Sequence, residues 1–379
     1  MIIGIDIRSL AQSHGSGVSI YTENLLAHLL PLDSQVNYKL FYSSYNYELP
    51  QYEWLRLPNV QVKRLRWPNR AIFTSSRFFG FPKIDKLLGG VDVFFSPHFF
   101  FVPLSLKARR VTNFHDLSFE RFPEFFTFRQ KFWHRFQMQP AWQARFSDAI
   151  IAVSDSTKND VASLYNIDPA KVERIYSGIN PLFKPVAAES LERFKDEREL
   201  PEKFILSVAT LEPRKNIVGL IKAFEFLKRG QGLEDYYLVI AGARGWHYRE
   251  IFNLAQQSKF KDHIVFTDWV WNWELPFYYT AASVFVYSSF FEGFGFPPLE
   301  AMACGTPVVV SNNSSLPEIV GNAGLLIDPY SIHDIAWAIR QVLEDKELKN
   351  RLIERGFERI KLFSWENAAR QTLQLLKRV

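Results

Sequence analysis

The sequence predicts an α/β protein built from two doubly wound domains, and three observations lead to this fold class. The chain has 379 residues, enough for two or three domains. Apolar runs rich in β-branched residues alternate with helical patterns along its length, and polar residues follow many of these runs, as is typical of buried parallel strands. The alternation pauses at residues 178–185, where one glycine and two prolines indicate a linker.

The first series of elements precedes this linker. We expect strands at residues 2–7, 91–95, 110–114 and 148–153. The first strand ends in a polar loop that contains Gly15-Ser16-Gly17, and a helical pattern follows at residues 18–30.

The second series follows the linker. We expect strands at residues 204–208, 237–241, 263–266, 284–287 and 308–310, with long helices between them. Ser364 is a helix N-cap with Glu366 in the first turn, which predicts a final helix at residues 365–379. We therefore expect an N-terminal domain at residues 1–183, joined by this last helix, a C-terminal domain at residues 184–364, and a hinge near residues 180–200.

The composition narrows the class of protein. Because 47% of the residues are hydrophobic, wholesale disorder is excluded. A single cysteine, Cys304, excludes an intramolecular disulfide and a cysteine-based metal cluster, and it fits a reducing compartment. The longest nearly apolar stretch, residues 97–106, is far too short to span a bilayer, and no secretory signal is visible at the N-terminus. We expect a cytoplasmic protein.

The charge is concentrated in one stretch. The chain as a whole carries a formal charge of +5, but residues 51–150 hold 16 Lys and Arg against 7 Asp and Glu, together with many aromatic residues. Three interpretations stay open. The stretch is a solvated basic surface over an aromatic core, or a contact surface for an anionic lipid-linked acceptor or for the face of the cytoplasmic membrane. Nucleic-acid binding would use the same residue types, but no recognised module is present, and we expect no nucleic-acid partner.

Residues 284–310 form the most informative segment. A buried strand leads into a loop with two glycines, tandem prolines fit the start of a short helix, and a further strand follows. Free amides at such a helix start favour a phosphate, and glycines let the backbone approach it closely. Glu292 and Glu300 would repel a phosphate unless they bind neutral hydroxyl groups, although a first-turn glutamate such as Glu300 also suits the helix dipole. A sugar nucleotide offers both the diphosphate and the hydroxyl groups.

Arg214 and Lys215 follow another apolar strand and precede a helical run at residues 217–227. This pattern places them at the carboxyl edge of the sheet, where open α/β sheets bind ligands. Two cations there would balance a diphosphate leaving group without a metal. A solvated basic loop is the simpler alternative.

These segments resemble family 4 of the retaining glycosyltransferases, which have the GT-B fold. Glu292-Gly-Phe-Gly-Phe-Pro-Pro-Leu-Glu300 resembles the glutamate-x7-glutamate signature of that family, and Ser207-Val-Ala-Thr-Leu-Glu-Pro-Arg214-Lys215-Asn216 resembles its strand-end motif. Further similarity lies at residues 151–157, 175–180 and 316–321. The resemblance implies two Rossmann-like doubly wound domains that face one another across a cleft. The sequence contains no Asp-x-Asp motif, which argues against the metal-dependent GT-A class.

The resemblance also implies roles for individual residues. Glu300 would bind the ribose, and Glu292 would act in catalysis and bind the transferred sugar. His115 would lie near that sugar and the reaction centre as a further catalytic group, although a structural histidine at a strand end is the alternative. Arg214 and Lys215 would hold the diphosphate during catalysis. The backbone groups of the remaining residues would bind the sugar (Gly293, Phe294, Gly295, Phe296), the diphosphate (Gly15, Ser16, Gly17) or the base (Trp269, Val270).

The function implied is that of a retaining hexosyltransferase of the EC 2.4.1 type. We expect transfer of a hexose from a UDP-glucose-like donor, with a GDP-mannose-like donor next, to a hydroxyl of a polysaccharide or lipid-linked glycan. The reaction would follow a front-face mechanism that needs no metal or other cofactor. Three alternatives stay open: a GT-B-fold phosphorylase, a sugar-nucleotide epimerase, and a non-catalytic protein that binds nucleic acid.

Overall fold

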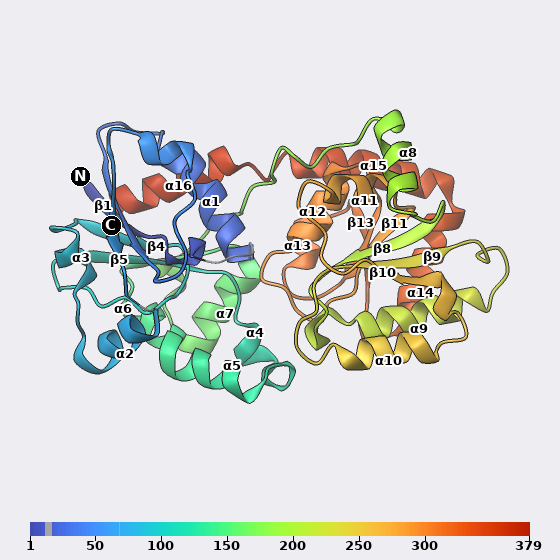
Figure 1. Ribbon diagram of the computed structural model, residues 1–379, viewed down its shortest axis with the longest axis horizontal. Coiled ribbons are helices and arrows are strands. Elements are labelled where there is room, and N and C mark those ends of the chain that lie inside the picture. The colour runs from blue at the N-terminus through green and yellow to red at the C-terminus, as the bar shows by residue number, and fades with distance from the viewer. Residues whose placement is uncertain (12–16, 68) are drawn as a thin grey trace. The chain divides into compact units, whose positions relative to one another are not determined.

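The computed structural model describes residues 1–11, 17–67 and 69–379 (Figure 1). The chain forms two compact units. The N-terminal unit comprises Met1–Gly178 and Ser364–Val379, and the C-terminal unit comprises Ile179–Phe363. Each unit is a parallel sheet covered by helices, so the predicted α/β class with two Rossmann-like domains is confirmed.

The sheet of the N-terminal unit has seven parallel strands in the order β3-β2-β1-β4-β5-β6-β7. The strands are β1 (Ile2–Asp6), β2 (Asn37–Ser43), β3 (Val60–Leu65), β4 (Val93–Ser96), β5 (Arg109–Phe114), β6 (Ala149–Ala152) and β7 (Val172–Arg174). Four of these correspond to predicted strands. The other three, β2, β3 and β7, were not predicted.

Two of the unpredicted strands were missed because they lie at the edges of the sheet. β3 is an edge strand with mostly exposed or half-buried residues, VQVKRL, and β7 is an edge strand of three residues. An edge strand does not need the continuous apolar run that marks a strand covered on both faces. β2 is an inner strand, but it begins with polar residues and so lacks a continuous apolar run along its whole length.

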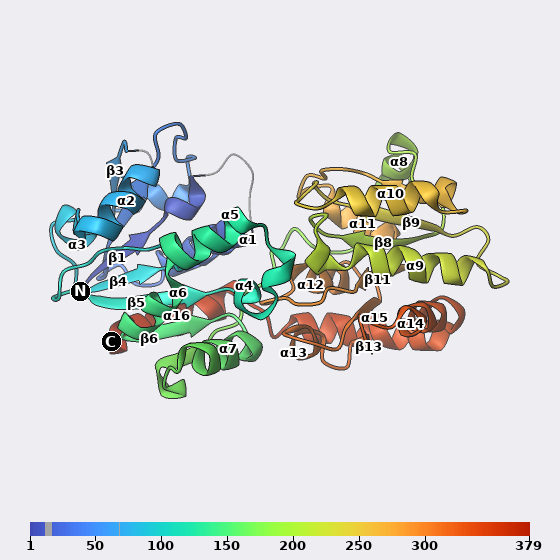
Figure 2. The same cartoon turned by 90° about the horizontal axis from the view of Figure 1, so that it is seen from below.

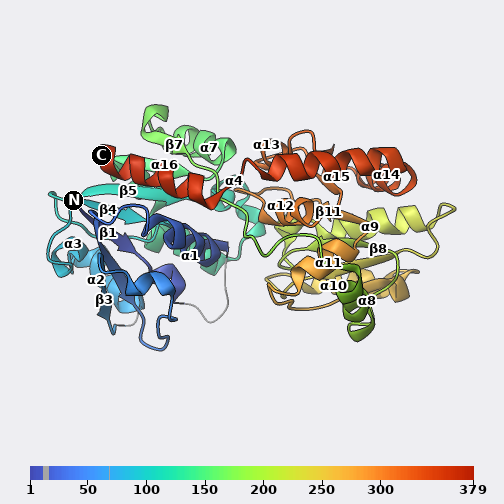
Figure 3. The same ribbon diagram turned by 90° about the horizontal axis from the view of Figure 1, so that it is seen from above.

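The helices of the N-terminal unit cover both faces of its sheet (Figures 2 and 3). They are α1 (Gly17–Leu29), α2 (Asn69–Phe79), α3 (Ile84–Leu87), α4 (Ser118–Arg121), α5 (Phe128–Phe132), α6 (Pro140–Phe146), α7 (Asp155–Tyr165) and α16 (Trp365–Arg378). A π-helical turn, Trp133–Met138, continues α5.

The last helix belongs to the N-terminal unit and packs beside α1 (Figure 3). Ser364 is its N-cap, as predicted, because the Ser364 hydroxyl accepts from the backbone N–H of Asn367. The ring of Trp365 packs edge-on against Tyr21 of α1.

The C-terminal unit has a sheet of six parallel strands in the order β10-β9-β8-β11-β12-β13. They are β8 (Phe204–Val208), β9 (Tyr237–Ala241), β10 (Ile264–Phe266), β11 (Val284–Tyr287), β12 (Val308–Ser311) and β13 (Gly324–Ile327). All but the edge strand β13 were predicted. Its helices are α8 (Ala188–Glu197), α9 (Ile217–Lys228), α10 (Arg249–Gln257), α11 (Leu275–Ala281), α12 (Phe296–Ala303), α13 (Leu316–Val320), α14 (Ile332–Glu344) and α15 (Lys346–Ile360).

The strand order reverses between β1 and β4 in the N-terminal unit and between β8 and β11 in the C-terminal unit. Open parallel sheets bind ligands outside the carboxyl ends of the strands at such a point. β8 leads into the segment with Arg214 and Lys215, and β11 leads into the glycine loop at residues 288–295. The fold therefore brings the two informative sequence motifs to one place.

No helix in the described part of the chain is both long enough and apolar enough to cross a membrane.

Candidate active site

A buried ion-pair cluster lies at the reversal point of the C-terminal sheet. The Lys215 ammonium is 2.6 Å from Oε1 of Glu292, and the Arg214 guanidinium is 3.0 Å from Oε2 of the same carboxylate. A second carboxylate, Glu212, lies 2.7 Å from the other side of Arg214. All four side chains are at most 13% exposed. The cluster joins the loop after β8 to the loop after β11.

Backbone contacts hold these two loops together. The N–H of Phe290 donates to the carbonyl of Arg214 at 2.9 Å, and the Arg214 guanidinium donates to the carbonyl of Phe291 at 2.7 Å. Lys215 also donates to the hydroxyl of Tyr287, the last residue of β11, at 2.8 Å. Arg214 and Lys215 are therefore placed by the end of the neighbouring strand as well as by their own.

Two serines near the start of α13 hold the glycine loop in place through hydrogen bonds. Glu292 donates its N–H to the Ser314 hydroxyl at 2.9 Å. The Ser315 hydroxyl donates to the carbonyls of Glu292 and Phe294 at 3.0 and 2.7 Å. Gly295 caps α12 with φ of 109°, and a side chain there would come within 2.8 Å of Leu316. Only glycine takes this conformation without strain.

Helix α12 begins at Phe296, and its two prolines lie in the first turn, as predicted. Prolines suit that position because the first N–H groups of a helix have no partner within the helix. Pro297 and Pro298 have no N–H, so the N–H groups that the start of α12 offers to a ligand are those of Gly295 and Phe296. Phe294 is buried and packs on Phe296 and Phe363, so its side chain stabilises the loop.

The protonation of Glu292 is set by its two cations. Burial alone would raise the pKa of Glu292, but the charges of Lys215 and Arg214 outweigh it and hold the pKa at about 2. Burial and the neighbouring Arg214 lower the pKa of Lys215, while Glu292 opposes this shift. Glu292 is therefore a carboxylate at neutral pH and has no proton to donate.

Glu300 lies on α12 in a different environment. Its Oε2 accepts a hydrogen bond from the Tyr279 hydroxyl at 2.8 Å. Burial raises the pKa of Glu300 to about 7, although the bond from Tyr279 opposes the shift. The two glutamates of the signature thus differ by about five pKa units, because only one of them faces cations.

His115 lies in the N-terminal unit, directly after β5. Its Nε2 is 2.8 Å from the carbonyl oxygen of Pro97. Burial lowers the pKa of His115 to about 4, although the bond to Pro97 opposes this, so the ring is neutral at pH 7. The amide nitrogen of Asn113 also lies 3.1 Å from Nε2, but the contact with Pro97 is the shorter one. Because a carbonyl oxygen only accepts, we assign the ring proton to Nε2, which makes Nδ1 an acceptor. The edge of the ring packs against Tyr21.

The remaining residues are those predicted to bind the diphosphate and the base. Gly15 and Ser16 lie outside the described residues, and Gly17 is the exposed first residue of α1. Trp269 and Val270 follow β10, the edge strand two positions from β8. Trp269 is 43% exposed and Val270 is buried.

The structure thus brings Arg214, Lys215 and Glu292 into contact at the glycine loop. It also reveals residues that sequence reasoning missed: Glu212, Tyr279, Tyr287, Ser314 and Ser315. For Glu212, the signal was its position directly before the Pro-Arg-Lys segment, in the strand-end motif. The roles of the two tyrosines and two serines depend on contacts between distant segments, which carry no local signal.

Among the described residues, no three His, Cys, Asp or Glu side chains converge in a way that would hold a metal ion. Metal independence stays a prediction.

Comparison with known proteins identifies the family. Residues 189–359 match the family described as glycosyl transferases group 1, and residues 15–182 match the one described as glycosyltransferase family 4. The O-antigen chain mannosyltransferase B of Escherichia coli is 35% identical over 280 residues, which are 73% of this chain and 72% of that protein. The chain belongs to glycosyltransferase family 4. It is a glycosyltransferase of the EC 2.4.1 type, as predicted.

Other relatives of this family 4 glycosyltransferase agree. An uncharacterized glycosyltransferase of Methanocaldococcus jannaschii is 31% identical over 351 residues, 87% of each chain. The serotype-specific mannosyltransferase WbdA of Escherichia coli is 32% identical over 243 residues, which span 63% of this chain but only 30% of that protein.

Solved structures confirm the GT-B fold of this glycosyltransferase. Sucrose-phosphate synthase from Thermosynechococcus elongatus superposes with a TM-score of 0.77 at 22% identity, covering 100% of this chain and 98% of that one. HepE of Anabaena, solved in complex with UDP and glucose, superposes with a TM-score of 0.73 at 17% identity, covering 100% of this chain and 99% of that one. At these identities the likeness shows the fold alone.

Proposed function

We propose that this glycosyltransferase transfers mannose, with retention of the anomeric configuration, from a nucleotide-diphosphate mannose to a hydroxyl of a surface polysaccharide or its lipid-linked precursor. The cluster of Glu292, Arg214 and Lys215 beside the start of α12 is the observation that carries the proposal. Two of the relatives reported above are named as mannosyltransferases, which favours mannose over the glucose that the sequence placed first. The donor nucleotide in this proposal is GDP, with UDP next.

The diphosphate of the donor binds Arg214, Lys215 and the N–H groups at the start of α12. Glu212 contacts Arg214 at 2.7 Å, and Glu292 contacts both cations, at 2.6 Å from Lys215 and 3.0 Å from Arg214. A diphosphate placed there shares the cations with that carboxylate. Groups already fixed around the developing charge stabilise it without reorganisation, and this is how the site would accelerate departure of the diphosphate.

Retention follows a front-face route. The bond between the anomeric carbon and the β-phosphate oxygen breaks, and its electron pair stays on the diphosphate. The acceptor oxygen bonds to the anomeric carbon on the same face, and its proton passes to the departing phosphate oxygen. Arg214 and Lys215 balance the charge of that leaving group. This route needs neither a metal nor a covalent intermediate on the protein.

The carboxylate of Glu292 stays ionised during this step because its pKa is about 2. It therefore orients a sugar hydroxyl and stabilises positive charge on the sugar ring, and it does not act as an acid. His115 is neutral, so Nδ1 accepts a hydrogen bond from a sugar hydroxyl. Glu300 binds the ribose hydroxyls, and Trp269 with Val270 lines the base site.

We also propose that the N-terminal unit contacts an anionic membrane surface, where a lipid-linked acceptor would be found. Phe128, Phe132 and Phe136 are exposed at 81%, 48% and 49% and recur every fourth residue along α5 and its π-helical continuation. Arg129 and Arg135, both exposed, flank this aromatic stripe. Aromatic side chains with flanking cations are the pattern that binds the headgroup region of anionic bilayers.

Donor preference tests the central part of this proposal. The full chain is incubated with GDP-mannose, UDP-glucose, UDP-galactose or GDP-fucose and a mannose-containing acceptor that carries an apolar aglycone. We expect product and free GDP only with GDP-mannose, and an α-linked product by NMR from the α-configured donor. A β-linked product would exclude retention, and turnover of UDP-glucose alone would exclude the mannosyl donor.

Vesicle binding tests the membrane contact. We expect the chain to co-sediment with anionic vesicles and not with neutral ones, and the substitutions Phe132→Ser and Phe136→Ser to release it. The exposed Phe226 of α9 is the matched control, since Phe226→Ser removes an aromatic side chain of similar exposure from the other unit. Equal co-sedimentation of all variants would exclude the stripe as the contact.

A further inference from the structure

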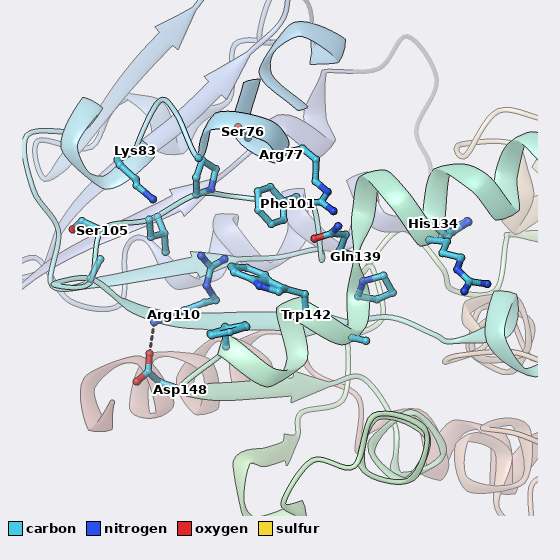
Figure 4. Close-up of a pocket in the computed structure, with 18 of the residues that line it drawn as sticks. Ser76, Arg77, Lys83, Phe101, Ser105, Arg110, His134, Gln139, Trp142 and Asp148 are labelled. Carbon is cyan, nitrogen blue, oxygen red and sulfur yellow. Dashed lines mark hydrogen bonds between the residues drawn. The ribbon is translucent and has the colours of Figure 1, made fainter. Parts of the chain in front are cut away.

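A large pocket lies within the N-terminal unit, apart from the residues assigned to the donor (Figure 4). It has a volume of about 1210 Å³ and is enclosed by α2, α6, the π-helical turn and the segment before β5. Arg110 at the start of β5 and Asp148 just before β6 line it, so the pocket reaches the amino end of the sheet. His115 lies at the opposite end of β5 and does not line it.

Arg110 is the most informative residue of this pocket. It is 5% exposed, and its guanidinium donates to two neutral acceptors, the carbonyl of Val102 at 2.6 Å and the amide oxygen of Gln143 at 3.0 Å. No carboxylate in the described part of the chain lies within 4.0 Å of the guanidinium. Burial lowers the pKa of Arg110 to about 10, although the more distant charges of Asp148 and Asp85 oppose this shift, so the group stays charged at pH 7. A buried cation that no carboxylate contacts directly is destabilising, and an anionic ligand would relieve this.

The side chains that line the pocket carry a net positive charge. Five cations line the pocket: Arg77, Lys83, Arg110, Lys131 and Arg135. None of the five forms an ion pair with a described residue. The lining contains only two carboxylates, and both have other partners: Asp148 pairs with Arg109 at 2.9 Å, and Glu120 accepts from the Tyr165 hydroxyl at 3.2 Å.

The cations approach the pocket from different elements. In Figure 4, Lys83 points in from the residue just before α3, and Arg110 points in from β5 beside the ring of Trp142. The Arg110 guanidinium lies 5.3 Å from the centre of that ring. An anion in this space would therefore meet Arg110 on one side and Lys83 on the other.

Much of the remaining lining is apolar. Large apolar side chains contribute from several segments, namely Phe101, Leu104, Leu106, Phe119, Trp142 and Phe146. Leu106 and Phe146 are exposed, so the apolar lining continues to the surface of the unit. A free phosphate would leave most of the volume unfilled, because pockets of roughly 300–1,000 Å³ already hold whole drug-sized ligands.

We propose that this pocket binds a phosphate or diphosphate ester that carries a hydrocarbon chain. The phosphate contacts Arg110 and Lys83, and the chain lies along Trp142 and Phe146 toward the surface. Two sources share this chemistry: the isoprenoid-phosphate carrier of a lipid-linked glycan and a membrane phospholipid. The binding itself does not depend on which sugar the enzyme transfers. Only the assignment to a lipid-linked glycan rests on the acceptor in the proposed function.

Calorimetric titration of the full chain tests the proposal. Saturating GDP and UDP are present throughout. They occupy the donor site, so binding of a diphosphate probe to that site cannot be mistaken for binding in the pocket. The probes are farnesyl diphosphate, inorganic pyrophosphate and farnesol. We expect farnesyl diphosphate to bind at least about tenfold more tightly than either fragment, since each lacks half of the complementary surface. Equal binding of pyrophosphate would reduce the pocket to an anion site, equal binding of farnesol would reduce it to an apolar cavity, and no binding would overturn the proposal.

Two variants locate the site. Lys83→Gln and Arg110→Gln each remove one proposed phosphate contact, and Lys83 is half-buried and free of ion pairs with described residues, so its loss leaves the fold intact. Lys107→Gln is the matched control, because Lys107 is exposed on the neighbouring segment and does not line the pocket. We expect about tenfold weaker binding of farnesyl diphosphate in Lys83→Gln and no change in Lys107→Gln. Equal weakening in both would show general electrostatic attraction and overturn the site.

The two sources are separated by a competition experiment. Vesicles of phosphatidylcholine with phosphatidic acid are added to the complex with farnesyl diphosphate. If the vesicles displace farnesyl diphosphate from the wild-type chain but not from Lys83→Gln, the pocket is assigned to a phospholipid. Persistence of the complex assigns it to an isoprenoid phosphate.

Discussion

The ammonium of Lys215 and the carboxylate of Glu292 lie 2.6 Å apart, although 77 residues separate them in the chain. Lys215 follows β8 and Glu292 follows β11, and the two strands are neighbours in the sheet only because the strand order reverses between them. Both side chains are buried, so the pair is poorly screened by solvent. The contact fixes the position of a cation and a carboxylate at the point where this fold binds ligands.

Glu292→Gln tests the contribution of this pair to stability. The variant keeps the shape of the side chain but leaves the buried Lys215 without a contacting carboxylate and leaves Arg214 with Glu212 alone. We expect this to lower the free energy of unfolding by roughly 3 kcal/mol at pH 7. Because the pKa of Glu292 is lowered to about 2 on folding, the stabilisation is present above its ordinary pKa and is lost as the pH falls from about 4.5 toward 2. Thermal unfolding between pH 8 and pH 3 measures the difference.

The difference between wild type and Glu292→Gln should therefore be constant from pH 8 to about 5.5 and shrink below 4.5. Glu250→Gln is the control, since Glu250 is exposed on α10 and should behave like wild type at every pH. Equal stability of Glu292→Gln and wild type at pH 7 would contradict the account of the pair.

Glu300 should make nucleotide binding depend on pH. Its pKa is about 7, and two ribose hydroxyls donate better to a carboxylate than to a carboxylic acid. Nucleotide affinity should therefore rise as the pH increases from 6 to 8, and Glu300→Gln should abolish this rise. Tyr279→Phe removes the hydrogen bond that lowers the pKa, so the rise should move to higher pH. A pH-independent affinity in wild type, measured by calorimetry, would exclude this role.

Gly295→Ala should disturb the glycine loop. The new methyl group adds a close approach to Leu316 at 2.8 Å to the strain of a φ of 109°. Gly232→Ala isolates the strain alone, because Gly232 has φ of 88° and open space around the added atom. We expect a loss of roughly 1 kcal/mol for Gly232→Ala and a clearly larger loss, with weaker nucleotide binding, for Gly295→Ala. Equal melting temperatures of the two variants would count against the tight packing of this loop.

Trp269→Ala should weaken binding of the nucleoside part of the donor. Stacking of a base on an aromatic ring contributes about 1–3 kcal/mol, so the affinity for guanosine or uridine should fall about tenfold. Trp273→Ala is the matched control, because Trp273 is 55% exposed in the same segment and has no proposed role. If both variants bind nucleoside like wild type, the base site lies elsewhere.

The sequence predicted those parts of the fold that depend on local patterns. β11 is buried along its whole length and β8 along all but its last residue, and the apolar runs of these two strands allowed exact placement. The edge strands β3, β7 and β13 were missed because an edge strand does not need that pattern. The cap at Ser364 was found because it is encoded within four residues.

The site was predicted in its residues but not in its interactions. Arg214, Lys215 and Glu292 were each identified, yet their mutual contacts arise only from strand order. The different pKa values of Glu292 and Glu300 depend on which charges lie beside each carboxyl after folding, so no spacing rule foretells them. The burial of Arg110 was likewise not predictable from the sequence, because its neutral hydrogen-bond partners come from distant segments.

Calorimetric titration of GDP and UDP into wild type and Lys215→Met tests the central claim most directly. Lys222→Met on α9 is the control with the same change of charge, since Lys222 is exposed. The account predicts that whichever nucleotide binds wild type binds Lys215→Met about ten- to a hundredfold more weakly, while Lys222→Met is unaffected and the phosphate-free nucleoside binds all three chains alike. Equal affinity of Lys215→Met and Lys222→Met for the diphosphate would contradict it.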